Sequence, residues 1–479
     1  MKHVLAVASE IAPLVKTGGL ADVVGALPKA LAPHGYAVRT LVPGYPGMPT
    51  DGEEVWGGME IAGGPVSVRR TESAGLDLLV LHAPHLFDRP GGPYADEAGR
   101  DHPDNAERFA ALCLVARDLA LRGEPGGGDI GGRPDIVHAH DWQAALAPAH
   151  LRRRVGTVMT IHNMAFMGLA PMTKAEALGL DPDDEDLFEF WGRVSTLKAG
   201  MVAADRVTTV SPTYARELRR PEHGFGLDGV VRARGADFVG ILNGIDTDMW
   251  DPATDPHIRT FKGPAGKRRA KAALRRELGL PEGDGPLAVV VSRMTHQKGL
   301  DVLLDALPAF TDRGGQVALL GSGEVDLERR WRAAATHPHV SVTIGYDEAL
   351  SHRMYAGADA VLVPSRFEPC GLTQLYALRY GALPIVARTG GLADTVIDAN
   401  PMALQAGTAT GWQFHPVDAD TLAQVLGDVR DAWDRPVVWQ MMQRNAMRQP
   451  VGWDSSAARY AQLYESVLGE RRDGKSPRP

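Results

Sequence analysis

Residues 364–376, PSRFEPCGLTQLY, place an acid, a thiol, a glycine and a hydroxyl between two apolar runs. The run over 359–363 predicts a buried parallel strand, and the run that follows residue 373 predicts a helix. A helix that begins at the end of a strand offers free backbone N–H groups, and Gly371 would let an anion approach them closely. A carboxylate beside an anion is repulsive, so we expect Glu368 to bind neutral hydroxyls, such as those of a sugar. From this stretch alone, a surface turn with a capping glutamate is an equally good interpretation.

Two other stretches carry fixed positive charge next to a predicted strand end. In residues 292–299, SRMTHQKG, Arg293 and Lys298 lie five residues apart, and two such cations suit a diphosphate leaving group. A pair of surface cations is the alternative, and a helix N-terminus disfavours it unless an anion joins them. Residues 16–19, KTGG, form a glycine turn suited to an anion, but they match neither a P-loop nor a dinucleotide fingerprint. Alone, this turn is better interpreted as an ordinary loop with a solvated lysine.

Histidines follow two predicted strands, in HAHDW (138–142) and TIHN (160–163). In a strand, His138 and His140 share one face while Asp141 points to the other, so we favour a polar pocket wall over a metal site. A single histidine such as His162 is more often structural than catalytic. However, His162 joins several polar groups at equivalent strand ends.

Two glycine-rich loops, residues 321–324 and 389–392, also follow strands, and either could approach a phosphate. Tyr346 follows a strand as well and could stack on a base, although a half-buried loop tyrosine is an equally good interpretation. No acid pair suggests a glycoside hydrolase, no Gly-x-Ser-x-Gly elbow is present, and no lysine has the context of a Schiff base.

Composition narrows the class of protein. The 479 residues carry a net charge of −8 without a basic run, which argues against nucleic acid or an anionic membrane as the main partner. Two cysteines, Cys113 and Cys370, make neither a disulfide framework nor a zinc site, and they fit a reducing cytoplasm. The N-terminus predicts a first strand rather than a signal peptide, and no apolar run reaches the roughly 18 residues of a membrane helix.

Buried strands alternate with helices along the chain, which predicts parallel sheets with right-handed crossovers. In the first half we expect helices over 19–31 and 104–122, and strands over 4–8, 38–42, 76–82, 135–139, 157–161 and 206–210. Residues 243–267 break this alternation, and the segment 250–256, which is rich in Pro and Asp, predicts a domain connection. In the second half we expect a helix over 300–310 and strands over 287–291, 317–320, 340–344, 360–363 and 383–387. The fold class is therefore α/β, with two doubly wound domains and a last helix over 455–468.

Taken together, the motifs resemble bacterial glycogen synthases, of the glycosyltransferase family that also holds plant starch synthases. The resemblance covers nearly the whole chain. It runs through KTGGLADVVGALPKAL (16–31), PDNAERFA (103–110), PDIVHAHDWQA (134–144), TIHNMAF (160–166), LKAG (197–200), DRVTTVSPTYA (205–215), LNGIDTDMWDP (242–252), SRMTHQKGLDVLL (292–304), SRFEPCGLTQLYALRYG (365–381) and TGGLADTV (389–396).

The resemblance implies two Rossmann-like domains of the GT-B type that face each other across a cleft. Residues 1–244 would hold the acceptor and part of the donor diphosphate site, and residues 245–454 would hold the nucleotide sugar. A helix over 455–470 would return to the first domain, and we expect residues 471–479 to be disordered. The implied reaction is retaining transfer of glucose from ADP-glucose to the non-reducing end of an α-1,4-glucan in the cytoplasm, without metal or cofactor.

The resemblance also implies roles for individual residues. Glu368, His162, Lys298, Arg293 and Asp141 would act in catalysis, with Glu368 on the glucose hydroxyls and His162 beside the transferred sugar. Asn163, Asn243 and Tyr94 would contact the sugar or the acceptor. The expected donor-binding residues are Lys16, Gly18, Arg293, Lys298, Gly321, Tyr346, Cys370, Gly371, Leu372 and Thr373.

Two positions bear on the branch of the family. Many retaining transferases of similar fold place a second glutamate eight residues after the first; Tyr376 stands there, which agrees with glycogen synthases. Gln143 replaces a common histidine after HDW.

Because no carboxylate is placed as a nucleophile, we expect front-face attack, in which a phosphate oxygen takes the acceptor's proton. The alternatives are the same fold with UDP-glucose or another acceptor, and a non-catalytic glucan-binding protein. A glucan phosphorylase is a third alternative, but it would need a pyridoxal-binding lysine, and no lysine of this sequence has that context.

Overall fold

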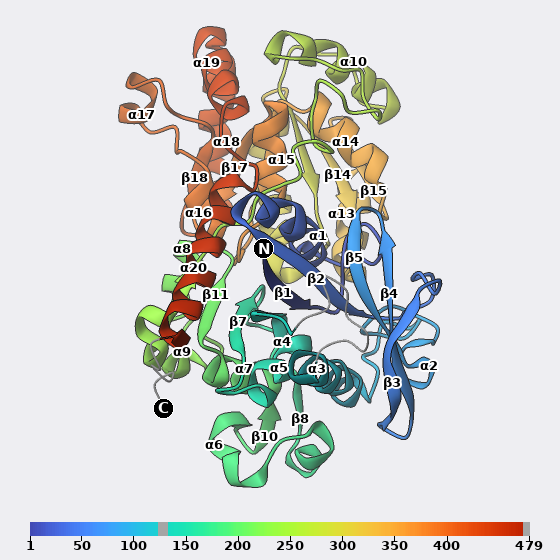
Figure 1. Cartoon of the computed structure of the whole chain (residues 1–479). Helices are drawn as coiled ribbons and strands as arrows, with labels where there is room; N and C mark the ends of the chain where they lie inside the picture. Colours follow the sequence, from blue (N-terminus) through green and yellow to red (C-terminus); the bar gives the residue numbers. More distant parts are fainter. Residues whose placement is uncertain (123–132, 473–479) are drawn as a thin grey trace. The chain divides into compact units, whose positions relative to one another are not determined.

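The computed structural model describes residues 1–122 and 133–472 (Figure 1). The chain divides into two compact units. Unit 1 comprises Met1–Asn243 and Trp453–Pro479, and unit 2 comprises Gly244–Gly452. Residues 241–263, in which the boundary falls, form neither helix nor strand. In the described ranges, no helix is long and apolar enough to cross a bilayer.

Unit 1 is built on a nine-stranded sheet. Its strands, in spatial order, are β12 (Phe238–Gly240), β11 (Arg206–Thr209), β7 (Gly156–Ile161), β6 (Ile136–His140), β1 (Lys2–Val7), β2 (Tyr36–Pro43), β5 (Leu76–His82), β4 (Gly64–Ser73) and β3 (Glu53–Ile61). The pairs from β12 to β5 are parallel. Because β1 lies between β6 and β2, the strand order reverses there, and such switch points place ligands at the carboxyl ends of the strands.

The expectation of a purely parallel sheet is wrong at one edge, where β3, β4 and β5 pair antiparallel. Two turns of the sequence Ala-Gly join these strands, and all four residues have positive φ, as in the type I′ turns of hairpins. Most residues of β3 are exposed, and β4 alternates buried residues with exposed or half-buried ones over residues 64–69, so both strands lack the continuous apolar run that marks a buried parallel strand.

Helices and a small second sheet complete unit 1. In α1 (Gly19–Leu31), Leu20, Val23, Val24, Leu27 and Leu31 are buried, as the apolar spacing predicts. Other helices of unit 1 are α3 (Asn105–Arg122), α4 (Asp141–Ala144), α5 (Leu146–His150), α6 (Glu185–Phe188), α7 (Thr196–Ala203), α8 (Pro212–Glu217) and α9 (Asp228–Arg234). The small antiparallel sheet has the order β8 (Leu169–Pro171), β10 (Arg193–Ser195) and β9 (Glu189–Phe190).

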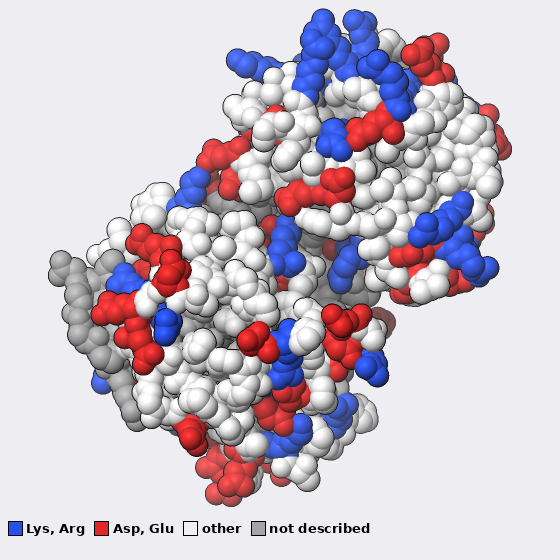
Figure 2. Space-filling view, turned by 90° about the vertical axis from the view of Figure 1, so that its right-hand side faces the viewer, with Lys and Arg blue, Asp and Glu red and all other residues white. Residues whose placement is uncertain are grey.

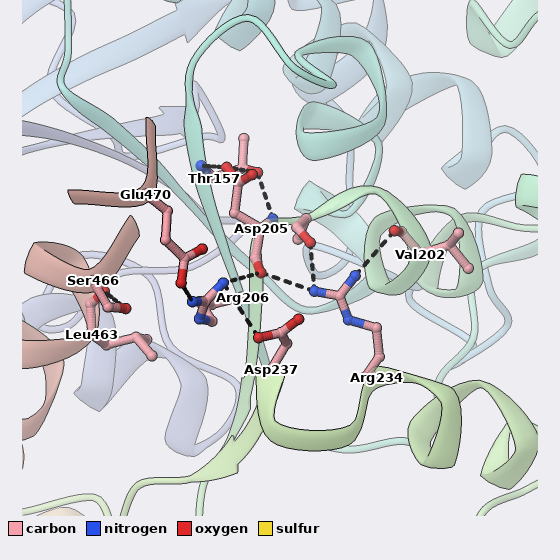
Figure 3. Close-up of polar contacts among 10 residues, drawn as sticks. Thr157, Val202, Asp205, Arg206, Arg234, Asp237, Leu463, Ser466 and Glu470 are labelled. Atoms are coloured by element: carbon pink, nitrogen blue, oxygen red, sulfur yellow. Dashed lines mark hydrogen bonds and ion pairs between the residues drawn. The ribbon is translucent and has the colours of Figure 1, made fainter. Parts of the chain in front are cut away.

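The last helix, α20 (Asp454–Arg472), packs on unit 1 through buried residues that include Tyr460 and Tyr464. Figure 3 shows the guanidinium of Arg206, at the start of β11, pairing with Glu470 of this helix. The tail predicted for 471–479 begins too early, because Arg471 still belongs to α20 and donates to the carbonyl of Val155 over 2.6 Å. Residues 473–479 lie outside the described residues.

Unit 2 has a six-stranded sheet in which every neighbouring pair is parallel. The order is β15 (Val340–Ile344), β14 (Gln316–Gly321), β13 (Leu287–Val291), β16 (Ala360–Val363), β17 (Leu383–Ala387) and β18 (Trp412–Phe414). The surrounding helices are α10 (Lys267–Glu277), α11 (Leu300–Ala306), α12 (Pro308–Thr311), α13 (Val325–Ala334), α14 (Glu348–Gly357), α15 (Thr373–Tyr380), α16 (Gly390–Thr395), α17 (Pro401–Gln405), α18 (Ala419–Trp433) and α19 (Pro436–Met447). The single helix expected over 300–310 is wrong: it divides before Pro308, which has no N–H to continue it.

Candidate active site

In unit 2, the ends of two neighbouring strands bring Lys298 and Glu368 together. Lys298 closes the short turn after β13, and Glu368 follows β16. The Lys298 Nζ lies 2.6 Å from Oε2 of Glu368, and Ser365 Oγ donates to the same oxygen over 2.9 Å. Glu368 is only 6% exposed, so its charge is held by these two donors rather than by bulk water.

Arg293 lies on the same loop but is exposed. Among residues 1–122 and 133–472, no hydrogen bond or ion pair engages its guanidinium, so its charge is available to a ligand. Tyr346, after β15, is 77% exposed, and its hydroxyl donates to Glu348 over 3.0 Å. Packing alone requires glycine at position 321, because a Cβ there would lie 1.9 Å from the carbonyl oxygen of Ser292.

Gly390 and Gly391 pack directly against the backbone of the loop between Glu368 and α15. A Cβ on Gly390 would lie 1.9 Å from the carbonyl oxygen of Glu368, and one on Gly391 would lie 2.3 Å from that of Cys370. Cys370 itself is 4% exposed. Gly371 has φ +73°, a backbone conformation that suits glycine. The residue before α15 is Leu372, whose apolar side chain cannot cap the helix, which leaves the first N–H groups to bind an anion.

In unit 1, the carboxylate of Asp141 accepts hydrogen bonds from the backbone at the end of β7. Its Oδ1 accepts from the N–H of His162 over 2.6 Å and from the N–H of Asn163 over 3.3 Å. The expectation that Asp141 continues the strand of His138 and His140 is wrong. The strand ends at His140, and Asp141 begins α4 with φ +57°, which turns its carboxylate back toward the end of β7. Burial raises the pKa of Asp141 to about 7.

Three histidines line the interior behind this carboxylate. The rings of His138 and His140 lie 4.2 Å apart between centroids, and His140 Nδ1 lies 3.1 Å from His162 Nε2. Burial lowers the pKa of both His138 and His162 to about 3, so both are neutral at pH 7. His138 contacts Tyr464 Oη at 2.7 Å and Thr160 Oγ1 at 2.7 Å, which indicates a structural role. Within the part of the chain that the structure describes, no group of three or more His, Cys, Asp or Glu could hold a metal ion.

The glycine turn at residues 16–19 lies at the start of α1. Lys16 Nζ lies 2.8 Å from Asp22 Oδ1. Gly18 precedes α1 in an extended conformation, and a Cβ there would have nothing within 4 Å. Glycine has no side chain to cap the first N–H groups of α1, which leaves them to bind an anion.

Glu10 is the residue that our sequence reasoning missed. It is 3% exposed, accepts a hydrogen bond from Thr17 Oγ1 over 2.6 Å, and also accepts from the Tyr94 hydroxyl. It thus joins the turn at residues 16–19 to the loop of Tyr94, and its charge adds to the rise in the pKa of Asp141. The available signal was an acid directly after the apolar run of the first strand, at a strand's carboxyl end.

The predicted residues fall into two groups, one in each unit. Unit 1 brings together Lys16, Gly18, Tyr94, Asp141, His162 and Asn163, and unit 2 brings together Arg293, Lys298, Glu368, Gly371, Leu372 and Thr373. Asn243, the last residue of unit 1 before unit 2, is 7% exposed, and within the described ranges its buried Oδ1 has no hydrogen-bond partner.

Comparisons with known proteins agree with this architecture. The family model described as "Starch synthase catalytic domain" matches residues 3–233, and "Glycosyl transferases group 1" matches residues 271–439. The solved catalytic domain of starch synthase IV from Arabidopsis thaliana, bound to ADP and acarbose, has a TM-score of 0.86 at 32% identity, with 98% of this chain and 99% of that chain covered. The fold and the site therefore define a glycosyltransferase of the GT-B type.

Sequence relatives narrow this class. The glycogen synthase of Paracoccus denitrificans (strain Pd 1222) is 55% identical over 477 residues, covering 98% of this chain and 100% of the relative. The glycogen synthase of Jannaschia sp. (strain CCS1) is 56% identical, covering 98% and 99%. The chain belongs to the glycogen synthase and starch synthase family.

Proposed function

We propose that this glycosyltransferase moves glucose from ADP-glucose to the non-reducing end of an α-1,4-glucan, with retention of configuration. The family supports a glucan product, and the related plant enzyme was solved with ADP and acarbose. The observation that carries the proposal is the preformed Lys298–Glu368 pair, together with the exposed Arg293 on the same loop as Lys298. This arrangement offers positive charge for a diphosphate and a carboxylate for sugar hydroxyls.

In unit 2, the two cations neutralise the diphosphate, which becomes a good leaving group without a metal. The amides of Gly371, Leu372 and Thr373 bind a phosphate oxygen at the start of α15. Glu368 orders the glucose through its hydroxyls. Gly321 and Cys370 shape the pocket wall, and Tyr346 stacks on the base.

In unit 1, Lys16 and the amide of Gly18 are the proposed ligands of the donor's diphosphate. His162 lies beside the transferred sugar; because its imidazole is neutral, it donates or accepts a hydrogen bond and does not add positive charge. Asp141 positions His162 and Asn163 through their backbone N–H groups. Asn163, Asn243 and Tyr94 contact the sugar and the acceptor.

The reaction proceeds by front-face attack. The acceptor 4-hydroxyl approaches on the side from which the phosphate leaves, the bond from C1 to the phosphate oxygen breaks, and that phosphate takes the hydroxyl proton. The only buried carboxylate of the unit 2 group, Glu368, is already engaged by Lys298 and Ser365, which does not favour it as a nucleophile. Isolation of a glycosyl–enzyme adduct would contradict this mechanism.

The test is a donor competition in the presence of a chelator. Purified protein is incubated with short maltooligosaccharides and either ADP-glucose or UDP-glucose, and released nucleoside diphosphate and chain length are measured. Extension with ADP-glucose at much the higher efficiency supports both the donor and the metal-free mechanism. Extension with UDP-glucose alone overturns the donor, loss of activity in chelator overturns the metal-free step, and no extension with either donor overturns the proposed function.

A further inference from the structure

A fully buried arginine lies at the start of α3, next to the loop that carries Tyr94. Figure 2 shows Lys and Arg side chains at the molecular surface, whereas Arg108 is 0% exposed. Its guanidinium donates to the carbonyl of Leu86 over 2.7 Å, to the carbonyl of Pro93 over 3.0 Å and to Oδ1 of Asn105 over 2.6 Å. All three of these acceptors are neutral. Arg108 therefore holds the segment that leads to Tyr94 against α3.

Folding alone does not favour a cation at this position. Burial lowers the pKa of Arg108, because the charged guanidinium loses its hydration. The residue also lies in the first turn of α3, where the helix dipole disfavours positive charge. The rings of Phe87 and Phe109, whose centroids lie 5.1 and 5.5 Å from the guanidinium carbon, offset part of this cost. An apolar side chain would fill the same space without the cost, so we attribute the arginine to its hydrogen bonds.

Asn105 connects the buried arginine to the backbone of Tyr94. The Oδ1 of Asn105 accepts from Arg108, and its Nδ2 donates to the carbonyl of Tyr94 over 2.8 Å. The same carbonyl accepts from the N–H of His102 over 3.0 Å. Because a guanidinium has only donors, it fixes which end of the Asn105 amide is the acceptor. Arg108 thereby directs the amide N–H groups of Asn105 toward Tyr94.

The side chain of Tyr94 is fixed within unit 1 as well. Its hydroxyl donates to Glu10, which also binds the turn at residues 16–19. Its ring packs against that of Phe109 in α3, with centroids 5.9 Å apart, and the ring of Phe109 meets that of Trp142 edge-on at 5.2 Å. The start of α3 therefore joins the loop of Tyr94 to α4, the helix that begins with Asp141.

We propose that Asn105 and Arg108 are positioning residues for the glucan acceptor, which act by fixing the backbone and the ring of Tyr94. This inference rests on the proposed function, in which Tyr94 contacts the acceptor. Tyr94 is only half-buried, whereas Arg108 is fully buried, so the arginine acts through Tyr94 and does not touch the sugar. A displacement of about 1 Å at a substrate contact can lower a rate about 100-fold, so loss of this anchorage weakens use of the acceptor.

Asn105→Asp separates positioning from folding. Aspartate keeps an acceptor for Arg108 and pairs its charge, but it has no N–H for the carbonyl of Tyr94 and places an oxygen against it. The melting temperature should therefore not fall, because a buried charge gains a partner. The order of the loop is measured by deuterium exchange of its hydrogen-bonded N–H groups, which belong to Gly92, Asp96, Gly99 and His102. In Asn105→Asp we expect residues 92–102 to exchange about tenfold faster than in wild type.

The matched control is Asn400→Asp, in unit 2. Asn400 is exposed and caps α17 by accepting from the N–H of Ala403 over 3.0 Å. Aspartate caps a helix as well as asparagine does, so this variant adds the same charge without loss of a contact. Its melting temperature, its exchange over residues 92–102 and its kinetics should match wild type.

Kinetics with both substrates test the link to the acceptor. Initial rates are measured with maltotriose varied at saturating ADP-glucose, and with ADP-glucose varied at saturating maltotriose. We expect Asn105→Asp to raise the KM for maltotriose about tenfold and to leave the KM for ADP-glucose unchanged. Arg108→Lys keeps the charge but not the planar fork of donors, so it should raise the KM for maltotriose to a similar extent.

Unchanged exchange of residues 92–102 in Asn105→Asp would overturn the anchorage of the loop. Faster exchange with an unchanged KM for maltotriose, or with equal losses for both substrates, would overturn the positioning role. Kinetics of Arg108→Lys equal to those of wild type would remove Arg108 from this role. Failure of wild type to extend any glucan would overturn the proposed function instead, and the exchange rates would still decide whether Asn105 holds the loop.

Discussion

Replacement of Asp141 by asparagine should stabilise the protein increasingly as the pH rises. Burial raises the pKa of the Asp141 carboxyl from 3.8 to about 7, so the folded state holds a proton that the unfolded state has lost. This carboxyl contributes most to stability below pH 3.8, and its contribution falls until the pH passes about 7. The whole change corresponds to about 4 kcal/mol, at about 1.4 kcal/mol for each pH unit.

Asparagine keeps the acceptor oxygen for the N–H groups of His162 and Asn163, and it tolerates the φ of +57° at residue 141. Between pH 5.5 and 7, Asp141→Asn should therefore gain about 2 kcal/mol of unfolding free energy relative to wild type, and then stay level. For a unit of this size the gain corresponds to a rise of about 5 °C in melting temperature. Activity should fall despite the gain, because the variant lacks the negative charge beside the proposed sugar site.

Calorimetry of wild type and variant at half-unit steps from pH 5.5 to 8.5 measures this difference. The buried histidines, whose pKa values are lowered, lose their stabilising contribution as the pH falls below about 6.5, but they do so in both proteins and cancel. Asp183→Asn, at an exposed acid of the same unit, is the control and should shift the melting temperature equally at every pH. A difference for Asp141→Asn that does not vary with pH, or a variant less stable than wild type at pH 8, would refute the reasoning.

Four further predictions rest on contacts within the two units. Lys298→Ala and Arg293→Ala should each lower kcat/KM about 100-fold, but only Lys298→Ala should also cost about 3 kcal/mol in urea unfolding, since it leaves a buried carboxylate unpaired; equal losses of stability would contradict this. Gly390→Ala should unfold far more readily, by about 3 kcal/mol or more, because its Cβ would lie 1.9 Å from a carbonyl oxygen. The Cβ added by Gly18→Ala would meet no atom within 4 Å, so this variant should melt like wild type. It should nevertheless lose activity, because Gly18 is a proposed ligand of the donor; normal kinetics would remove Gly18 from the donor site. Tyr464→Phe should lower stability by about 1–2 kcal/mol with unchanged kcat/KM, because within residues 1–122 and 133–472 its hydroxyl hydrogen-bonds only to the buried His138; a kinetic defect would show that the contact reaches the active site.

Much of the fold could be predicted because buried parallel strands have continuous apolar sequences. The strands β5, β13, β15, β16 and β17 have the predicted bounds. The antiparallel hairpin of β3 and β4 was missed because half-exposed strands lack such a run. The helix break at Pro308 was visible in the sequence, because proline lacks the N–H that continues a helix.

The candidate site, like the fold, could be predicted only in part. Strand ends in the sequence point to Glu368, Lys298 and His162, because the carboxyl ends of parallel strands meet at one edge of a sheet. Asp141 was treated as a strand residue, whereas it begins α4 with positive φ, and a single residue with positive φ leaves no mark in composition. Glu10 was missed because its partners, Thr17 and Tyr94, lie 7 and 84 residues away along the chain.

The sequence by itself determined which residue types stand at each strand end and that two α/β series occupy one chain, because both depend on local apolar runs and loop composition. The tertiary structure alone decided which charges meet. The pairing of Lys298 with Glu368 spans 70 residues, and the contact of Tyr464 with His138 spans 326. It also decided which ionisable groups are deprived of water, and hence that Asp141 titrates near pH 7 while His162 stays neutral. Burial is a property of the packed fold and not of any stretch of sequence, so these pKa values could not be predicted before the structure was known.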